Sequence, residues 1–229
     1  RAEFHFIKGP VFANVVLADE INRTPPKTQA ALLEAMEERQ VTAAGKTMPL
    51  PQPFFVLATQ NPIELEGTYP LPEAQLDRFV LNPVLSYLDL DDEQEMVART
   101  TSPERPQLTA VLNADEILQV QQLVREVPAP QNVVSFAVRL VAATRPAETA
   151  DADIKRNIKW GAGSRASQYL ILAGKARALL HGRYNVAIED VKALARPIMR
   201  HRVITSFHAD AEGVTAENLI DRLVDQTPE

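Results

Sequence analysis

The sequence contains no cysteine among its 229 residues. This absence excludes a disulfide framework and any metal site that depends on thiolate ligands. A reducing cytosol is the natural compartment for such a chain, so we expect a cytoplasmic protein. The four histidines lack the spacing of metal ligands, which argues against a histidine metal site at His5, His181, His201 or His208.

The sequence also lacks a long apolar run and an excess of positive charge. No apolar segment approaches the roughly 18 residues that a bilayer-spanning helix needs, so we expect no membrane insertion. The 24 basic and 30 acidic residues give a formal charge of −6. This balance argues against a general polyanion-binding surface, and we expect no nucleic acid partner.

A phosphate-cradling loop is a third missing feature. That loop has a glycine, four further residues and then Gly-Lys-Ser or Gly-Lys-Thr. The nearest match, Gly45-Lys46-Thr47, lacks the first glycine and falls in an expected hairpin turn. Because Arg1 leads directly into a strand-like stretch at 4–7, we expect a chain that begins within a domain.

Residues 1–83 alternate between strand-like and helix-like segments, as an α/β domain does. The continuous apolar runs at 15–18 and 54–58 predict buried strands of a parallel sheet. Thr24 is a candidate N-cap for the first helix, since two prolines follow it. The expected strands are 4–7, 15–18, 40–43, 46–50, 54–58 and 79–81, and the expected helices are 25–38 and 72–77.

From residue 84 onward the apolar residues recur at helical spacing. We therefore predict two domains, an α/β core over 1–83 and an all-α domain over 84–229, with a surface loop at 144–153. The expected helices are 91–100, 114–127, 133–143, 164–181, 187–199 and 215–224.

Two adjacent carboxylates, Asp19 and Glu20, follow the strand at 15–18. The carboxyl ends of parallel strands are where open α/β sheets bind their ligands. Asp19 is a suitable oxygen ligand for a hydrated Mg²⁺ beside a triphosphate, and Glu20 could polarise the attacking water. The alternative is that the acids only open the helix that follows them.

Asn61 lies just beyond the second strand of the sheet. An uncharged amide there could orient a water molecule or contact a γ-phosphate near Glu20. The alternative is ordinary turn chemistry before Pro62.

Two arginines are candidate phosphate contacts. Arg78 lies between a short helix and a strand, where it could project toward a neighbouring subunit, although a surface ion pair with Glu73 or Asp77 would also explain it. Arg165 lies in the first turn of a helix, opposed to the helix dipole, which favours an anion at that terminus. A solvated side chain is the alternative for Arg165.

Taken in order, these segments resemble the AAA+ ATPases. The resemblance is closest to the MoxR family, and it rests on LADEINR at 17–23, KTQAALLEAM at 27–36, ATQNP at 58–62 and PLPEAQLDRF at 70–79.

This resemblance implies ATP hydrolysis by a ring, commonly a hexamer, with each nucleotide held between two subunits. Asp19 and Glu20 then match the Walker B pair, with Asp19 supporting Mg²⁺, Asn61 matches sensor 1, Arg78 the arginine finger and Arg165 sensor 2. It further implies a chaperone that remodels partners, often proteins with von Willebrand factor A domains, sometimes during metal-cofactor insertion.

The missing phosphate loop is a departure from the family pattern. We expect a truncated sequence whose α/β part is not stable without its upstream strands, because their ladder hydrogen bonds are unmade. The alternative is a non-hydrolysing adaptor that kept the fold and lost the loop.

Overall fold

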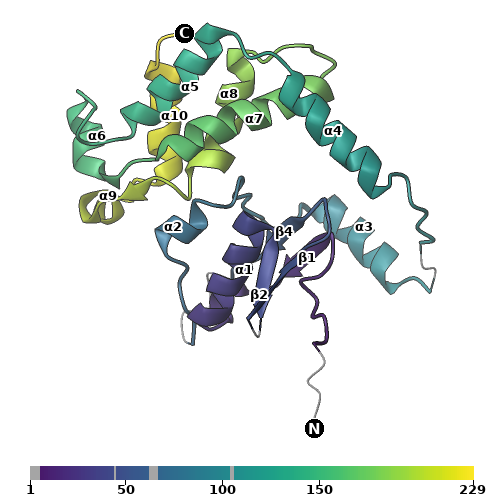
Figure 1. The fold of residues 1–229 in the computed structure, drawn as a ribbon. Coiled ribbons are helices and arrows are strands. Elements are labelled where there is room, and N and C mark those ends of the chain that lie inside the picture. Colours follow the sequence, from purple (N-terminus) through teal and green to yellow (C-terminus); the bar gives the residue numbers. More distant parts are fainter. Residues whose placement is uncertain (1–5, 44, 62–66, 104–105) are drawn as a thin grey trace.

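The computed structural model describes residues 6–43, 45–61, 67–103 and 106–229. An α/β part with sheet strands and helix α1 lies below a helical part that contains the C-terminus (Figure 1). In the described residues, no helix combines the length and apolar character that crossing a bilayer requires.

β1 (Val15–Ala18) and β4 (Phe55–Ala58) form a parallel two-stranded sheet, in register along all four residues of each strand. This confirms the predicted parallel sheet. The prediction that these strands are buried is wrong for one face of the sheet. Alternate residues of a strand point to opposite faces, and the side chains on one face are exposed. Its residues are 49% to 64% exposed, and they are Val15, Leu17, Phe55 and Leu57.

Helix α1 (Pro26–Glu38) follows β1 after a 3-10 turn, η1 (Ile21–Arg23). A proline at the first helical position suits the start, because its missing N–H would have no intrahelical partner. The predicted N-cap role of Thr24 is wrong. Its hydroxyl donates instead to the Ile21 carbonyl at 2.7 Å, and Pro25 occupies the cap position.

β2 (Gln40–Ala43) and β3 (Lys46–Pro49) form the predicted antiparallel hairpin, and β2 packs against α1. The strand predicted at 4–7 does not form at residues 6 and 7, and its first two residues, Phe4 and His5, lie outside the described part.

The segment after α2 (Glu73–Leu76) differs from the prediction. Residues 79–81, expected to be a strand, belong to none. Their backbone groups are paired with the helical part instead: the Asn82 N–H donates to the Pro197 carbonyl at 2.7 Å, and the Phe79 carbonyl accepts from Arg202 at 2.6 Å. A strand needs a neighbouring strand to pair with, and within the described residues no strand pairs with 79–81; contacts from the helical part hold the segment there.

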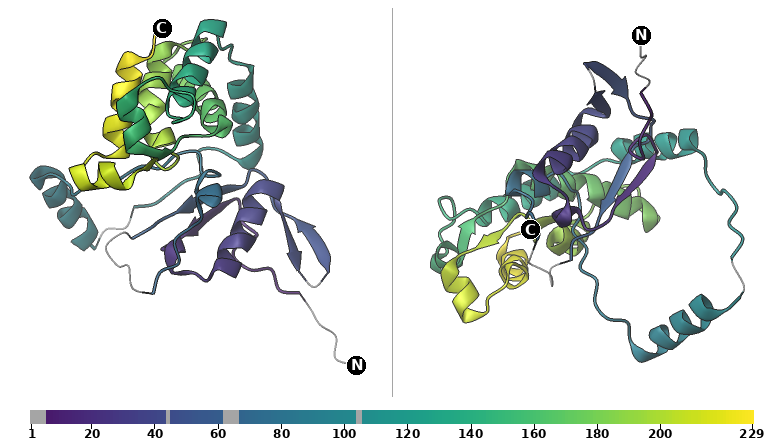
Figure 2. Two further views of the ribbon diagram at one scale, coloured as in Figure 1. Left: turned by 90° about the vertical axis from the view of Figure 1, so that its left-hand side faces the viewer. Right: turned by 90° about the horizontal axis from the view of Figure 1, so that it is seen from below.

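The helical part is built on one core, to which the four main helices each contribute buried apolar residues. Phe136, Leu140, Leu170, Ile198 and Ile220 are fully buried in it. These helices confirm the predicted ones and pack together in both views of Figure 2. They are α5 (Gln131–Ala143), α7 (Ser164–Leu180), α8 (Ile188–Met199) and α10 (Ala216–Gln226).

Short elements in the same part were not predicted. The expected loop at 144–153 gives way at Ala152 to a short helix, and the strand directly after this helix pairs antiparallel with residues 204–205. The helices predicted at 91–100 and 114–127 are present as α3 (Leu90–Thr101) and α4 (Ala114–Glu126), which contain no buried residue. The unpredicted elements are α6 (Ala152–Asn157), β5 (Ile158–Trp160), β6 (Ile204–Thr205) and α9 (Phe207–Glu212).

A buried carboxylate joins α7 to α8. Asp190 is fully buried and accepts hydrogen bonds from Arg177 at 2.6 Å, Arg183 at 2.7 Å and the Ala187 N–H at 2.9 Å. Burial alone would raise the pKa of Asp190, but these hydrogen bonds outweigh it and hold the pKa well below its ordinary value of 3.8.

Asp190→Asn is therefore expected to lower the free energy of unfolding of the full-length protein by about 2 to 4 kcal/mol at pH 7, because two guanidinium groups lose their partner. A depressed pKa gives stability that is complete above the ordinary value of 3.8 and is lost as the pH falls toward the folded value. Urea unfolding at pH 7 and pH 3 tests this. The difference in free energy of unfolding between variant and wild type is expected to be smaller at pH 3 than at pH 7. Asp221→Asn, at the exposed partner of Arg196, is the control. An equal difference at both pH values contradicts the prediction.

Candidate active site

The two predicted acids lie at the carboxyl edge of the parallel sheet. Asp19 and Glu20 follow the last residue of β1, and Thr59 follows the last residue of β4 on the neighbouring strand. The Thr59 hydroxyl donates to Asp19 Oδ1 at 2.5 Å and accepts from the Glu20 N–H at 2.8 Å. One hydroxyl thus links the carboxylate of one acid to the backbone of the other.

Glu20 has a strained backbone. Its φ of 48° and ψ of 50° are left-handed, a conformation that costs a residue other than glycine about 1 to 2 kcal/mol. Such strain is common at functional sites, where the surroundings hold it in place. Here the hydrogen bond from its N–H to Thr59 holds it, while its carboxylate pairs with Arg23 at 3.3 Å.

Asn61 lies at the same edge of the sheet. It is the third residue after β4, and its carbonyl accepts a hydrogen bond at 3.3 Å from the side chain of Asn22, which belongs to η1 directly after Glu20. The segment that carries the two acids and the segment that carries Asn61 are therefore joined to each other at this edge of the sheet.

The acid pair fits a magnesium ion held mainly by phosphate and water. Mg²⁺ is commonly bound through one or two carboxylates together with substrate phosphates. Asp19 is exposed and directed to the sheet edge, and the described residues contain no group of three or more acids or histidines that would form an all-protein cage. These residues can supply the metal and water contacts, whereas the chain has no loop to cradle the phosphates.

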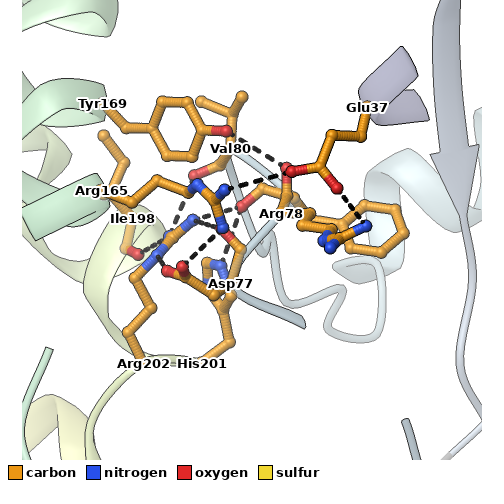
Figure 3. A network of polar contacts seen from close by, with 10 residues as sticks. Glu37, Asp77, Arg78, Val80, Arg165, Tyr169, Ile198, His201 and Arg202 are labelled. Atoms are coloured by element: carbon orange, nitrogen blue, oxygen red, sulfur yellow. Dashed lines mark hydrogen bonds and ion pairs between the residues drawn. The ribbon is translucent and has the colours of Figure 1, made fainter. Parts of the chain in front are cut away.

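The two predicted arginines lie together, at the joint between the α/β part and the helical part (Figure 3). Arg78 Nη1 forms an ion pair with Glu37 Oε2 at 2.6 Å. Arg165, from the first turn of α7, pairs with Asp77 Oδ2 at 2.9 Å and lies 3.8 Å from the other carboxylate oxygen of Glu37. One carboxylate of α1 thus faces both guanidinium groups.

Helix α1 separates the acids from the arginines. The side chain of Gln29 donates to the Ile21 carbonyl at 3.1 Å, which places the residue after Glu20 beside the first half of α1. Glu37 is in the last turn. At a rise of 1.5 Å per residue, Gln29 and Glu37 lie about 12 Å apart along the helix axis. The predicted site residues therefore form two groups. The acid group contains Asp19, Glu20 and Asn61, and the arginine group contains Arg78 and Arg165.

Several residues that shape these groups were not singled out in the sequence. Thr59, Glu37 and Arg202 carry no local signal that marks them as part of a site, and the side chain of Arg202 is 1% exposed. The ion-pair alternative for Arg78 named the wrong partners, since the arginine pairs with Glu37. No local pattern marks a partner that lies 39 residues away or more.

Comparisons with known proteins agree with this architecture. Residues 1–81 match the ATPase family associated with various cellular activities (AAA), and residues 150–223 match the AAA lid domain. The predicted boundary at residue 83 stays a prediction, because these two matches leave the residues between them unassigned.

Similar proteins extend the match over almost the whole chain. The chaperone MoxR1 of Mycobacterium tuberculosis is 42% identical over 226 residues, which cover 98% of this chain and 59% of that protein. The uncharacterised protein YeaC of Bacillus subtilis is 41% identical, over 97% of this chain and 67% of its own length.

A solved structure confirms the fold. The crystal structure of a candidate ATPase from Cytophaga hutchinsonii has a TM-score of 0.92 and 41% identity, and the match covers 97% of this chain and 68% of that one. The chain spans only part of each of these relatives. The parallel sheet, the helical lid and these similarities confirm the expected family: the chain belongs to the MoxR family of AAA+ ATPases.

Proposed function

We propose that this chain supplies the catalytic acids and the lid of a ring-forming ATPase whose nucleotide sites each need two chains. In this proposal Glu20 activates the attacking water, Asp19 supports Mg²⁺ and Asn61 orients the water beside the γ-phosphate. Arg78 and Arg165 contact phosphate. The supporting observation is that the residues of α1 that contact the two groups, Gln29 and Glu37, lie about 12 Å apart along the helix, which argues that one chain does not bring acids and arginines to the same phosphate.

The acid group suits water activation. Glu20 is held at its backbone by Thr59, so its partly exposed carboxylate is directed from a fixed position. A carboxylate within reach of the attacking water can accept its proton as the phosphorus–oxygen bond forms. Asp19 would hold a bound Mg²⁺, which would supply positive charge to stabilise the phosphate as negative charge develops on it. The hydrogen bond from Thr59 keeps one oxygen of Asp19 oriented and leaves the other for that ion.

The arginine group suits binding of a phosphate from a neighbouring chain. The Nε of Arg78 is buried without a hydrogen-bond partner, and a buried donor left unpaired costs about 1 to 3 kcal/mol. Its ion pair with Glu37 is partly exposed, and such pairs contribute only about 0 to 1 kcal/mol. A phosphate dianion is therefore a stronger partner for this guanidinium than the carboxylate it now contacts.

The proposed role beyond ATP hydrolysis rests on similarity to the relatives. MoxR1 carries the name chaperone, and we propose that this protein likewise remodels or activates partners. A hexamer, a partner with a von Willebrand factor A domain, a part in metal-cofactor insertion or complex assembly, and a cytoplasmic location stay predictions. The alternative is a non-hydrolysing adaptor that kept the fold and lost the phosphate loop.

Nucleotide-dependent assembly tests the proposal. Light scattering of the full-length protein is expected to show a several-fold increase in mass when a non-hydrolysable ATP analogue and Mg²⁺ are added, because a ligand shared by two chains stabilises their contact. ADP without Mg²⁺ is the control. An unchanged mass, together with no ATP hydrolysis, would support the adaptor instead.

A further inference from the structure

Arg202 lies just after α8, in the sequence Arg200-His201-Arg202, and its side chain is almost completely buried. Burying an arginine is costly unless each of its donors finds an acceptor. The acceptors it finds are not spread over the lid. Apart from the Ile198 carbonyl, they belong to the short segment that carries Arg78.

The guanidinium of Arg202 bonds the residues on both sides of Arg78. Nε donates to the Asp77 carboxylate at 2.7 Å, and Nη2 donates to the Asp77 carbonyl at 2.7 Å and to the Phe79 carbonyl at 2.6 Å. Nη1 is 3.4 Å from the Val80 carbonyl. A planar guanidinium with a fixed fork of donors fits such a set of acceptors, and lysine does not.

Two neighbours in the lid hold the same segment. The Tyr169 hydroxyl donates to the carbonyl of Arg78 itself at 3.3 Å, and the Tyr169 ring lies 5.1 Å from the Arg202 guanidinium. His201 Nε2 lies 3.0 Å from the Phe79 carbonyl. Burial lowers the pKa of His201 to about 4, so the ring is neutral at pH 7 and the proton sits on Nε2, donated to Phe79.

The lid supplies hydrogen bonds to the carbonyls of Phe79 and Val80, in a segment that pairs with no strand in the described part of the chain. Figure 3 shows Arg202, Tyr169 and His201 gathered around the turn from Asp77 to Val80. The backbone from which the Arg78 side chain projects is thus fixed to the lid of its own chain.

We infer that Arg202 is a positioning residue that fixes the Arg78 segment to the lid and thereby sets where Arg78 meets the nucleotide of the neighbouring chain. The inference rests on the proposed function, since it assumes that Arg78 acts across the subunit contact. It adds that the lid of each chain positions an arginine for the next chain.

Arg202→Lys in the full-length protein is the main test. It keeps the charge beside Asp77, but its three donors cannot serve the Asp77 carboxylate, the two flanking carbonyls and the Ile198 carbonyl at once, as the five donors of arginine do. We expect kcat to fall about 10- to 100-fold with KM for ATP within about twofold, since a small misplacement of a catalytic group has costs of that order. Arg196→Lys, on α8 and paired with Asp221, is the matched control and is expected to keep wild-type kcat.

Tyr169→Phe is the second test variant. It removes only the hydrogen bond from the Tyr169 hydroxyl to the Arg78 carbonyl, and kcat is expected to decrease a few-fold.

Two readouts separate positioning from support of the fold. In an Arg78→Ala background, Arg202→Lys is expected to cause no further loss, because residues that act through one another are not additive. When Arg202→Lys chains are mixed with Glu20→Gln chains, hydrolysis is expected to recover, because the second chain supplies a well-placed Arg78 to the intact acids of the first.

The outcomes distinguish this inference from the function on which it rests. A wild-type kcat for both Arg202→Lys and Tyr169→Phe, while Arg78→Ala is inactive, overturns the inference alone. A loss that mixing does not restore also overturns it, since Arg202 then supports only its own chain. If Arg78→Ala is fully active, the proposed role of Arg78 fails, and the inference fails with it.

Discussion

Replacement of Glu20 by glutamine is expected to slow ATP hydrolysis by the full-length protein by about 10²- to 10⁴-fold, the range typical for loss of a general base. The amide keeps the shape of the side chain, and the backbone hydrogen bond to Thr59 does not depend on the carboxylate. ATP affinity is therefore expected to stay within about twofold of wild type. Steady-state hydrolysis together with equilibrium binding of a fluorescent ATP analogue measures both quantities.

Glu34→Gln is a suitable control, because Glu34 is an exposed acid on α1 and belongs to neither group of the site. It makes the same chemical change without touching the sheet edge. Full hydrolysis in Glu20→Gln would falsify the assignment of Glu20 as the base. A loss of ATP affinity equal to the loss of rate would instead show that the carboxylate is needed to assemble the site.

The sequence predicted those parts of the fold that depend on neighbouring residues. The parallel pairing of β1 with β4 and the main helices of the lid were expected, because their apolar patterns and end signals are local. The strand predicted at 79–81 shows where this fails. Its local pattern is strand-like, but a strand forms only when another strand offers hydrogen bonds. Here the Phe79 carbonyl accepts a hydrogen bond from Arg202, more than 120 residues later in the chain.

The candidate site, like the fold, could be predicted only in part. Asp19, Glu20 and Asn61 could be expected at one sheet edge, since parallel strands bring their carboxyl ends together. That Arg78 and Arg165 would both face Glu37 could not be expected, because it depends on how the lid packs on α1. The sequence therefore indicated that the acids and Asn61 lie at one sheet edge, and only the structure showed that the two arginines lie beside the same glutamate.

Mutation of Arg78 to alanine is expected to reduce hydrolysis per chain by about 10³- to 10⁵-fold, the range reported for arginines that stabilise phosphoryl transfer. The ion pair with Glu37 is partly exposed, so its loss costs the fold little, and thermal stability is expected to change by no more than about 1 kcal/mol. Glu37→Gln is the control for that pair: it releases Arg78 without removing it, and hydrolysis is expected to persist.

Mixing distinguishes an arginine that acts on a neighbour from one that acts within its own chain. Arg78→Ala chains keep their acids, and Glu20→Gln chains keep their arginine. In a ring assembled at random from equal amounts, about one contact in four joins intact acids to an intact arginine. Hydrolysis in the mixture is then expected to reach about a quarter of the wild-type rate, although each variant alone is nearly inactive. If the arginine served its own chain, no contact in the mixture would be complete and the rate would stay near zero, so the recovered rate itself measures whether the acids and the arginine of one site belong to different chains.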